Sequence, residues 1–144
     1  MIRSSRRRGR EAALQLLYQT AVSGEPDQDA LELFWQSHPV ADETGALREF
    51  AEELVRAVLQ HSSRIDALID EAAVNWDLDR LSRVDLSLLR LAVGELIAFP
   101  ETPPPVVINE AVEIARRFSD EKAASFINGV LDRIAREQGS IRGK

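Results

Sequence analysis

The residues best suited to chemistry in this sequence are the arginines at its start. Residues 1–10 contain five Arg and no acidic residue, although the whole chain carries a net charge of −6. Guanidinium groups clustered in this way bind phosphates and release the condensed counterions of a nucleic acid. The cluster therefore predicts a localised anionic partner, with contacts from Arg3, Arg6, Arg7, Arg8 and Arg10.

A second set of side chains continues from this cluster along a predicted helix. At 100° per residue, Arg8, Glu11, Gln15 and Tyr18 share one face, away from the apolar stripe of Ala13 and Leu17. RNA-binding proteins combine cations for the backbone, rings for stacking and amides for base edges. The pattern predicts an RNA-binding face that includes Gln15 and Tyr18, and the alternative is a frayed, solvated basic terminus.

Phe126 is a second candidate for base stacking. It lies at the edge of an apolar helical stripe, with Lys122, Gly129 and Arg133 on the same flank. A ring bordered by Lys122 and Arg133 is suited to stacking on a base, whereas spacing alone favours a phenylalanine at the edge of the core. Arg116 and Arg117 either extend this basic surface or are solvated.

Asp85 interrupts the most apolar helix predicted in the chain. A carboxylate buried there without a partner costs several kcal/mol, about 2–7 for a polar group and more for a charge. Two interpretations remain open: an ion pair with an arginine of a neighbouring helix, or a surface that meets a binding protein.

Signals of catalysis are missing from the sequence. His38 and His61 do not have a metal-ligand spacing, and Asp77-Leu78-Asp79 is not followed by the Gly and ligand positions of a calcium loop. The sequence contains no cysteine and no Gly-rich phosphate loop. We therefore predict no catalytic residue, no metal and no cofactor, and the absence of cysteine suits a cytoplasmic protein.

The elements that must position these residues are predicted to be helices. The chain has 144 residues, 44% of them hydrophobic, which is enough for one domain, and no apolar run is long enough to span a membrane. Apolar spacing and Pro or Gly breaks predict an all-α, compact seven-helix bundle, with Ser119 capping the last helix. The expected ranges are about 4–22, 28–37, 45–61, 63–75, 79–98, 106–118 and 120–134.

Three stretches of the sequence match a known pattern. The segment 106–134 contains I-N-E-A-V-E-I-A-R-R-F followed by F-I-N-G-V-L-D, and Arg6–Ala13 precedes Leu16-Leu17-Tyr18-Gln19. Asn75-Trp76, Arg83-Val84-Asp85 and Leu88–Ala92 stand between them. In order and spacing these motifs resemble the NusB transcription antitermination family over nearly the whole chain.

The resemblance implies two helical subdomains, 1–61 with three helices and 62–144 with four. It implies binding of single-stranded boxA RNA together with NusE, a protein of the small ribosomal subunit, and entry into an RNA polymerase antitermination complex. It also places the acidic residue of the Asp85 motif on the NusE surface and an aromatic of the Phe126 motif on the RNA surface.

Two alternatives remain. One is a protein-interaction scaffold or homodimer that binds no RNA. The other is the RNA-recognition domain of an rRNA cytosine methyltransferase. That reading requires a longer protein, because the sequence ends at Lys144 without a Rossmann-type segment.

Overall fold

The computed structural model describes residues 5–40, 42, 44–73 and 81–142. Within these ranges the chain is entirely helical and contains no strand, which confirms the all-α class and the seven predicted helices. The helices are α1 (Ser5–Ser23), α2 (Gln28–Ser37), α3 (Ala46–Gln60), α4 (Ser62–Ala72), α5 (Arg83–Ala98), α6 (Pro104–Phe118) and α7 (Glu121–Arg142).

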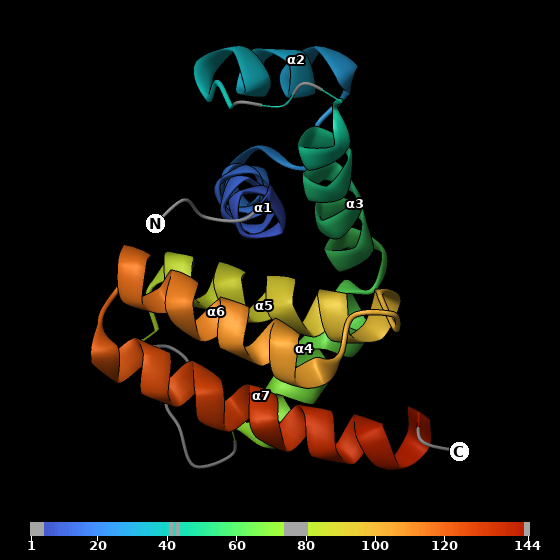
Figure 1. Ribbon diagram of the computed structural model, residues 1–144, viewed down its shortest axis with the longest axis vertical. Coiled ribbons are helices and arrows are strands. Elements are labelled where there is room, and N and C mark those ends of the chain that lie inside the picture. Colours follow the sequence, from blue (N-terminus) through green and yellow to red (C-terminus); the bar gives the residue numbers. More distant parts are fainter. Residues whose placement is uncertain (1–4, 41, 43, 74–80, 143–144) are drawn as a thin grey trace.

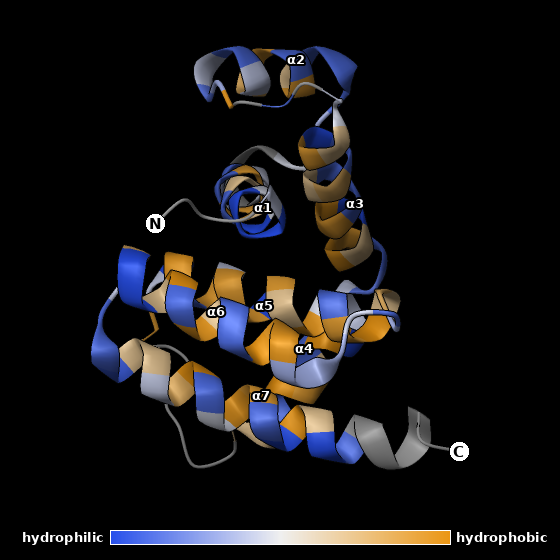
Figure 2. Ribbon diagram, in the orientation of Figure 1, coloured by the Kyte–Doolittle hydropathy of each residue, from blue (hydrophilic) through white to orange (hydrophobic). Residues whose placement is uncertain are grey.

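Helix α5 occupies the centre of the molecule. It contacts α1, α3, α4, α6 and α7, and in Figure 1 α5 and α6 form a layer between α1 and α7. Residues from Asp85 to Leu96 on this helix are mostly buried, as expected for a helix that is apolar on nearly all sides. Figure 2 shows hydrophobic residues on α3, α5 and α6, and α5 packs against both of the other two helices.

The buried apolar cluster runs through both predicted subdomains. It includes Leu17 and Leu54 from the first half of the chain and Leu89 and Ile127 from the second. The two halves therefore share one core, and the division into residues 1–61 and 62–144 stays a prediction. Among the described helices none is long and apolar enough to cross a membrane.

Helix α3 approaches both α1 and α5 closely. A Cβ atom added at Gly94 would lie 2.8 Å from Val58 Cγ2, and one added at Gly9 would lie 2.8 Å from Phe50 Cδ2. Real Cβ atoms essentially never make contacts this short. Glycine at both positions therefore allows the helices to pack at this distance.

The start of α6 agrees with the sequence, whereas the residue that caps α7 does not. Pro104 occupies the first turn of α6, where its missing N–H removes no hydrogen bond. Asp120 Oδ1 accepts a hydrogen bond from the Ala123 N–H at 2.7 Å, so Asp120 caps α7. The prediction that Ser119 is the cap is wrong, because the Ser119 N–H donates to Ala115 O at the end of α6.

Two helix boundaries differ from the expected ones by several residues. Helix α5 begins at Arg83 rather than near residue 79, because Ser82 Oγ accepts the Asp85 N–H at 3.1 Å. Helix α7 continues to Arg142, beyond the last apolar position of its stripe at Ile134. The residues Asp77 and Asp79, considered above as calcium ligands, lie outside the described residues.

Candidate nucleic-acid interface

The described N-terminal arginines contact groups on α3, α5 and α6. Arg3 lies outside the described residues. Arg6 is exposed, with its guanidinium carbon 4.1 Å from the centroid of the Phe50 ring on α3. A cation over an aromatic face is attracted by the quadrupole of the ring, so Arg6 helps to hold α1 against α3.

Arg10 belongs to the core and not to the exposed cluster. Only 6% of it is exposed, and it forms a bidentate pair with Glu95, at 2.8 Å from Nε to Oε1 and 2.6 Å from Nη2 to Oε2. Glu95 is itself 2% exposed, so its carboxylate needs a cation inside the bundle. The prediction that Arg10 contacts RNA is wrong for this structure, because the guanidinium is committed to Glu95.

Arg7 is paired with a carboxylate on α6. Its Nε and Nη2 donate to the two oxygens of Glu110 at 2.9 and 2.6 Å, and Arg10 Nη1 lies 3.4 Å from the same carboxylate. The hydrogen bond from Arg7 holds the pKa of Glu110 below its ordinary value and raises the pKa of Arg7. Glu110 therefore fixes the first turn of α1 on α6, and a phosphate would have to share Arg7 with it.

The remaining face of α1 matches the predicted RNA-binding face in part. Gln15 and Tyr18 are exposed, Tyr18 to 39%, and Arg8 is half-buried. Glu11 departs from the expectation, because it is 7% exposed and its Oε2 lies 3.5 Å from Arg117 Nε on α6. A cation, an amide and a phenol therefore remain accessible on this face, with Glu11 beneath them.

A cleft opens beside this face. It has a volume of about 410 Å³ and lies between α1, the segment that follows α2 and the end of α6. We call it the α1–α6 cleft, and its polar and aromatic lining comes from Arg8, Glu11, Gln15, His38, Arg117 and Phe118. Its volume is within the range of small-molecule sites in proteins.

Phe118 is the residue of this cleft that sequence reasoning missed. Its spacing placed it on the apolar stripe of α6, yet it is 38% exposed, and Arg117 lies 5.5 Å from its ring centroid. Phe118 is the last residue of α6 and lines the cleft. Its position as the last residue before a predicted turn was the available signal.

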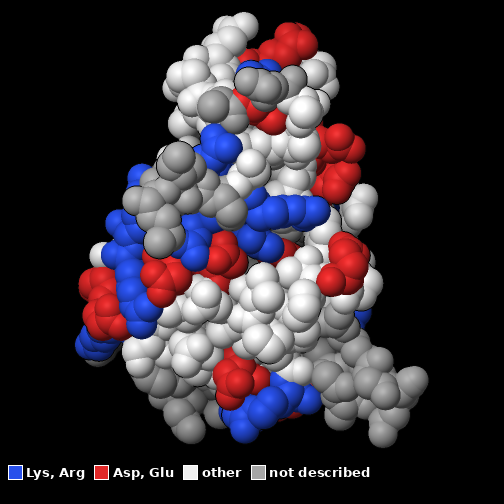
Figure 3. Space-filling view, in the orientation of Figure 1, with Lys and Arg blue, Asp and Glu red and all other residues white. Residues whose placement is uncertain are grey.

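The charges on this side of the molecule are mixed. In Figure 3 Lys and Arg side chains gather on the left of the visible face, with Asp and Glu side chains between them. Arg116 contributes little net charge to this surface, because it pairs with Glu113 and with Glu121. An RNA strand would therefore meet separate cations among acidic groups and not a continuous basic surface.

Phe126 lies in the core. It is 6% exposed and packs in the apolar cluster, so the expectation of an exposed stacking ring is wrong and the alternative of a core phenylalanine is confirmed. Lys122 is exposed, whereas Arg133 pairs with Glu137 at 3.2 Å and donates to Ala72 O at 3.3 Å. A Cβ added at Gly129 meets no atom within 4 Å, so the surface beside Lys122 and Arg133 is open. RNA contacts by these two cations stay a prediction.

Asp85 is buried in the first turn of α5, where it is 7% exposed. Among the described residues no ion pair involves this carboxylate, and its Oδ1 accepts no hydrogen bond. The positive end of the helix dipole favours a negative charge at this place. The internal ion pair, one of the two interpretations left open by the sequence, is thus not found in the described part of the chain, and a partner surface at Asp85 stays a prediction.

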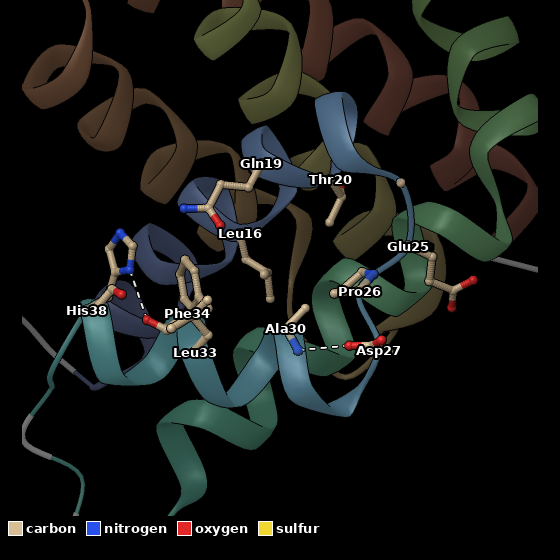
Figure 4. A pocket seen from close by; sticks show the side chains of 12 residues that line it. Leu16, Gln19, Thr20, Glu25, Pro26, Asp27, Ala30, Leu33, Phe34 and His38 are labelled. Carbon is tan, nitrogen blue, oxygen red and sulfur yellow. Dashed lines mark hydrogen bonds between the residues drawn. The ribbon is translucent and has the colours of Figure 1, made fainter.

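A second cleft, of about 480 Å³, lies between the end of α1 and α2. Figure 4 shows Gln19 and Thr20 on one side and Leu33 and Phe34 on the other. Glu25 and Asp27 line it, and their charge disfavours phosphate. His38 borders both clefts, with its ring stacked 4.2 Å from Phe34 and its Nδ1 2.9 Å from Phe34 O.

No group of three or more His, Cys, Asp or Glu side chains that could hold a metal ion occurs in residues 5–40, 42, 44–73 and 81–142. The accessible groups on the predicted RNA-binding face of α1 are Arg8, Gln15 and Tyr18, with the α1–α6 cleft beside them. Groups of these kinds can bind anions and stack on bases.

Comparison with known proteins identifies relatives along nearly the full chain. The model of the NusB family matches residues 7–136. The transcription antitermination protein NusB of Anaeromyxobacter dehalogenans (strain 2CP-1 / ATCC BAA-258) is 47% identical over 133 residues, which cover 92% of this chain and 91% of that protein. The protein of the same name from Geobacter sulfurreducens is 46% identical over 132 residues, covering 91% and 94%.

Solved structures show the same fold. A crystal structure of the antitermination factors NusB and NusE in complex with dsRNA matches with a TM-score of 0.78 and 30% identity, covering 92% of this chain and 97% of that one. The NusB of T. maritima matches with a TM-score of 0.76 and 37% identity, covering 94% of each chain.

Proposed function

The chain belongs to the NusB family, and from this premise we propose that it is an RNA-binding transcription antitermination factor that acts together with NusE. The RNA that it binds is a single-stranded boxA-type element. It works by binding, and we infer that it is not an enzyme. Two observations support this proposal. Its relatives are named transcription antitermination proteins, and a similar solved structure contains NusB bound to NusE and RNA.

One structural observation carries the proposal. The exposed side chains of Gln15 and Tyr18 lie on the same face of α1 as Arg8. An arginine supplies phosphate contacts, a tyrosine supplies a stacking surface, and an amide supplies donors and acceptors for base edges. Since the rest of the chain is acidic, we expect a short contact at this face and not general attraction to nucleic acid.

The proposed RNA contacts differ from those predicted from the sequence. Arg6, Arg8, Gln15 and Tyr18 remain as the principal set, with Arg7 shared with Glu110. Arg3, Lys122 and Arg133 remain as candidates at the margins, whereas Arg10 and Phe126 are structural.

We further propose that NusE binds at the start of α5, around Asp85. Asp85 is buried in the free protein with an Oδ1 that accepts no hydrogen bond in the described structure. A partner that supplies a donor there removes the cost of the buried polar atom, about 1–3 kcal/mol. We also propose that the protein joins an RNA polymerase antitermination complex, that it lies in the cytoplasm and that the free protein can form a homodimer.

Fluorescence anisotropy with a labelled boxA RNA tests the function. The protein is titrated alone and with NusE, against single-stranded RNA and against the same sequence as a duplex. We expect salt-dependent binding to the single strand that is tightened by NusE. Binding of NusE without any binding of RNA would instead identify an interaction scaffold.

A further inference from the structure

The α1–α6 cleft has the composition of a base-binding site. It combines an exposed aromatic ring, Phe118, with cations at Arg8 and Arg117 and a buried carboxylate at Glu11. Its volume of about 410 Å³ is ample for a ring system of one nucleotide. The segment that follows α2 contributes His38, Pro39 and Val40 to the cleft, and none of them was predicted from the sequence to bind RNA.

We propose that this cleft binds one unpaired base of the RNA, stacked on Phe118, and that it selects bases with an exocyclic amino group. The proposal rests on the proposed function and names a subsite for it. It assigns binding roles to Glu11, His38, Arg117 and Phe118, in addition to the exposed face of α1.

Stacking is the first step of the argument. Phe118 is 38% exposed at the end of α6, beside a cleft and under an arginine 5.5 Å from its ring centroid. Base–aromatic stacking contributes about 1–3 kcal/mol per base and accepts any base, because each base has a π-face. An arginine next to the ring can add a second planar group or bind the adjoining phosphate.

Selectivity among nucleobases comes from the buried carboxylate of Glu11 in the cleft. Glu11 is 7% exposed, and its Oε2 lies 3.5 Å from Arg117 Nε. An ionised carboxylate has about four lone-pair sites, so it can accept a hydrogen bond from a ligand in addition to its contacts within the protein. Cytosine, adenine and guanine offer an exocyclic amino group to such an acceptor. Uracil has no amino group, and its one ring donor, N3–H, stands between two carbonyl oxygens that the carboxylate repels.

The imidazole of His38, which also lines the cleft, is held in place by two contacts. Because a carbonyl oxygen only accepts, the contact of 2.9 Å to Phe34 O requires a hydrogen on His38 Nδ1. The ring is also stacked on Phe34 at 4.2 Å between centroids. Both contacts hold the imidazole in place, so Nε2 is the nitrogen that remains to contact a ligand.

Phe118→Leu is the decisive variant, because it keeps apolar bulk and removes the ring. We expect its affinity for single-stranded boxA RNA to fall about 5- to 150-fold with an unchanged melting temperature. Leu33→Ala is the matched control, since Leu33 is 63% exposed on α2 and lies outside this cleft. It should bind RNA like the wild type.

A double-mutant cycle identifies the bound base. RNAs with one abasic position each are titrated against the wild type and Phe118→Leu. At one position the abasic change should weaken binding to the wild type and have no further effect in the variant. Uracil at that position should bind more weakly than cytosine, and Glu11→Gln should reduce this difference.

The outcomes separate this inference from the proposed function. If the wild type binds RNA but Phe118→Leu binds equally well, or if every abasic change is additive with it, the subsite is refuted and the function stands. If the wild type binds no RNA, both are refuted. Should Phe118→Leu fold poorly, 2-aminopurine placed along the RNA gives a readout on the wild-type protein, and no change in its emission at any position would contradict stacking.

Discussion

Replacing Arg10 should destabilise the bundle strongly, although the sequence suggests an exposed arginine. In Arg10→Met the carboxylate of Glu95, which is 2% exposed, loses both of its hydrogen bonds from Arg10. Removing one member of a buried ion pair costs about 3–5 kcal/mol, because the other charge is left buried and uncompensated.

The magnitude can be expressed as a melting temperature. Unfolding entropies of about 2.1 cal/mol/K per residue give a chain of 144 residues a shift of roughly 3 °C per kcal/mol. We therefore expect Arg10→Met to melt about 10–17 °C below the wild type. Urea denaturation followed by far-UV circular dichroism gives the free energy independently.

Two further variants make the reasoning refutable. Arg10→Met combined with Glu95→Leu removes both charges and should recover much of the loss, because apolar replacement of a buried pair is often neutral or stabilising. Arg56→Met is the surface control, since Arg56 is 54% exposed and 3.6 Å from Glu52, and it should change stability by at most about 0.5 kcal/mol. If Arg10→Met is as mild as Arg56→Met, the buried pair does not stabilise the fold as argued.

Five other substitutions, in three tests, examine the packing and the site. Gly94→Ala should lower the free energy of unfolding, measured in urea, by about 1–3 kcal/mol, because its Cβ would lie 2.8 Å from a valine methyl of α3. Gly129→Ala, whose Cβ would meet no atom within 4 Å, should raise it by up to about 1 kcal/mol. Equal effects of the two substitutions would contradict the close packing at Gly94. The pKa of Glu110 is lowered in the folded state, so its carboxylate contributes fully to stability above its unfolded pKa of about 4.3. This contribution is lost as the pH falls through the folded pKa, so the loss of stability in Glu110→Gln should become smaller in acid. A loss that stays constant with pH would contradict this. Phe126→Ala should lose about 3–5 kcal/mol of stability, because Phe126 is buried. Tyr18→Leu should keep its stability and lose about 1–3 kcal/mol of RNA affinity, because Tyr18 is exposed. A stable Phe126→Ala with weak RNA binding, or an unstable Tyr18→Leu, would contradict these assignments.

Local features of the fold could be predicted from the sequence because they depend on neighbours along the chain. Apolar spacing identified the helices, and the apolar character of α5 identified its central place. Pro103, Pro104 and Pro105 marked the start of α6. The misassigned helix ends include two that depend on one hydrogen bond, the Asp120 cap of α7 and the Ser82 cap of α5, and the C-terminal end of α7, which continues past its apolar stripe.

The site was less predictable because its contacts join distant parts of the chain. Arg10 pairs with Glu95, 85 residues away, and Arg7 with Glu110, 103 residues away. A signal did exist for Arg10, because residues 10, 13 and 17 have the spacing of the buried stripe of α1. For Phe126 and Phe118 the spacing was similar, and only the neighbouring helices determine that the first is covered and the second exposed.

The slope of RNA affinity against salt tests the central claim most directly. Arg6→Gln with Arg8→Gln removes two charges from α1, and Arg56→Gln with Arg136→Gln removes two exposed charges from α3 and α7. If the start of α1 contacts the phosphates, the slope of log affinity against log salt should become shallower by roughly 1.4 in the first variant and stay unchanged in the second. Equal slopes in the wild type and both variants, measured with single-stranded boxA RNA, would contradict binding through this face.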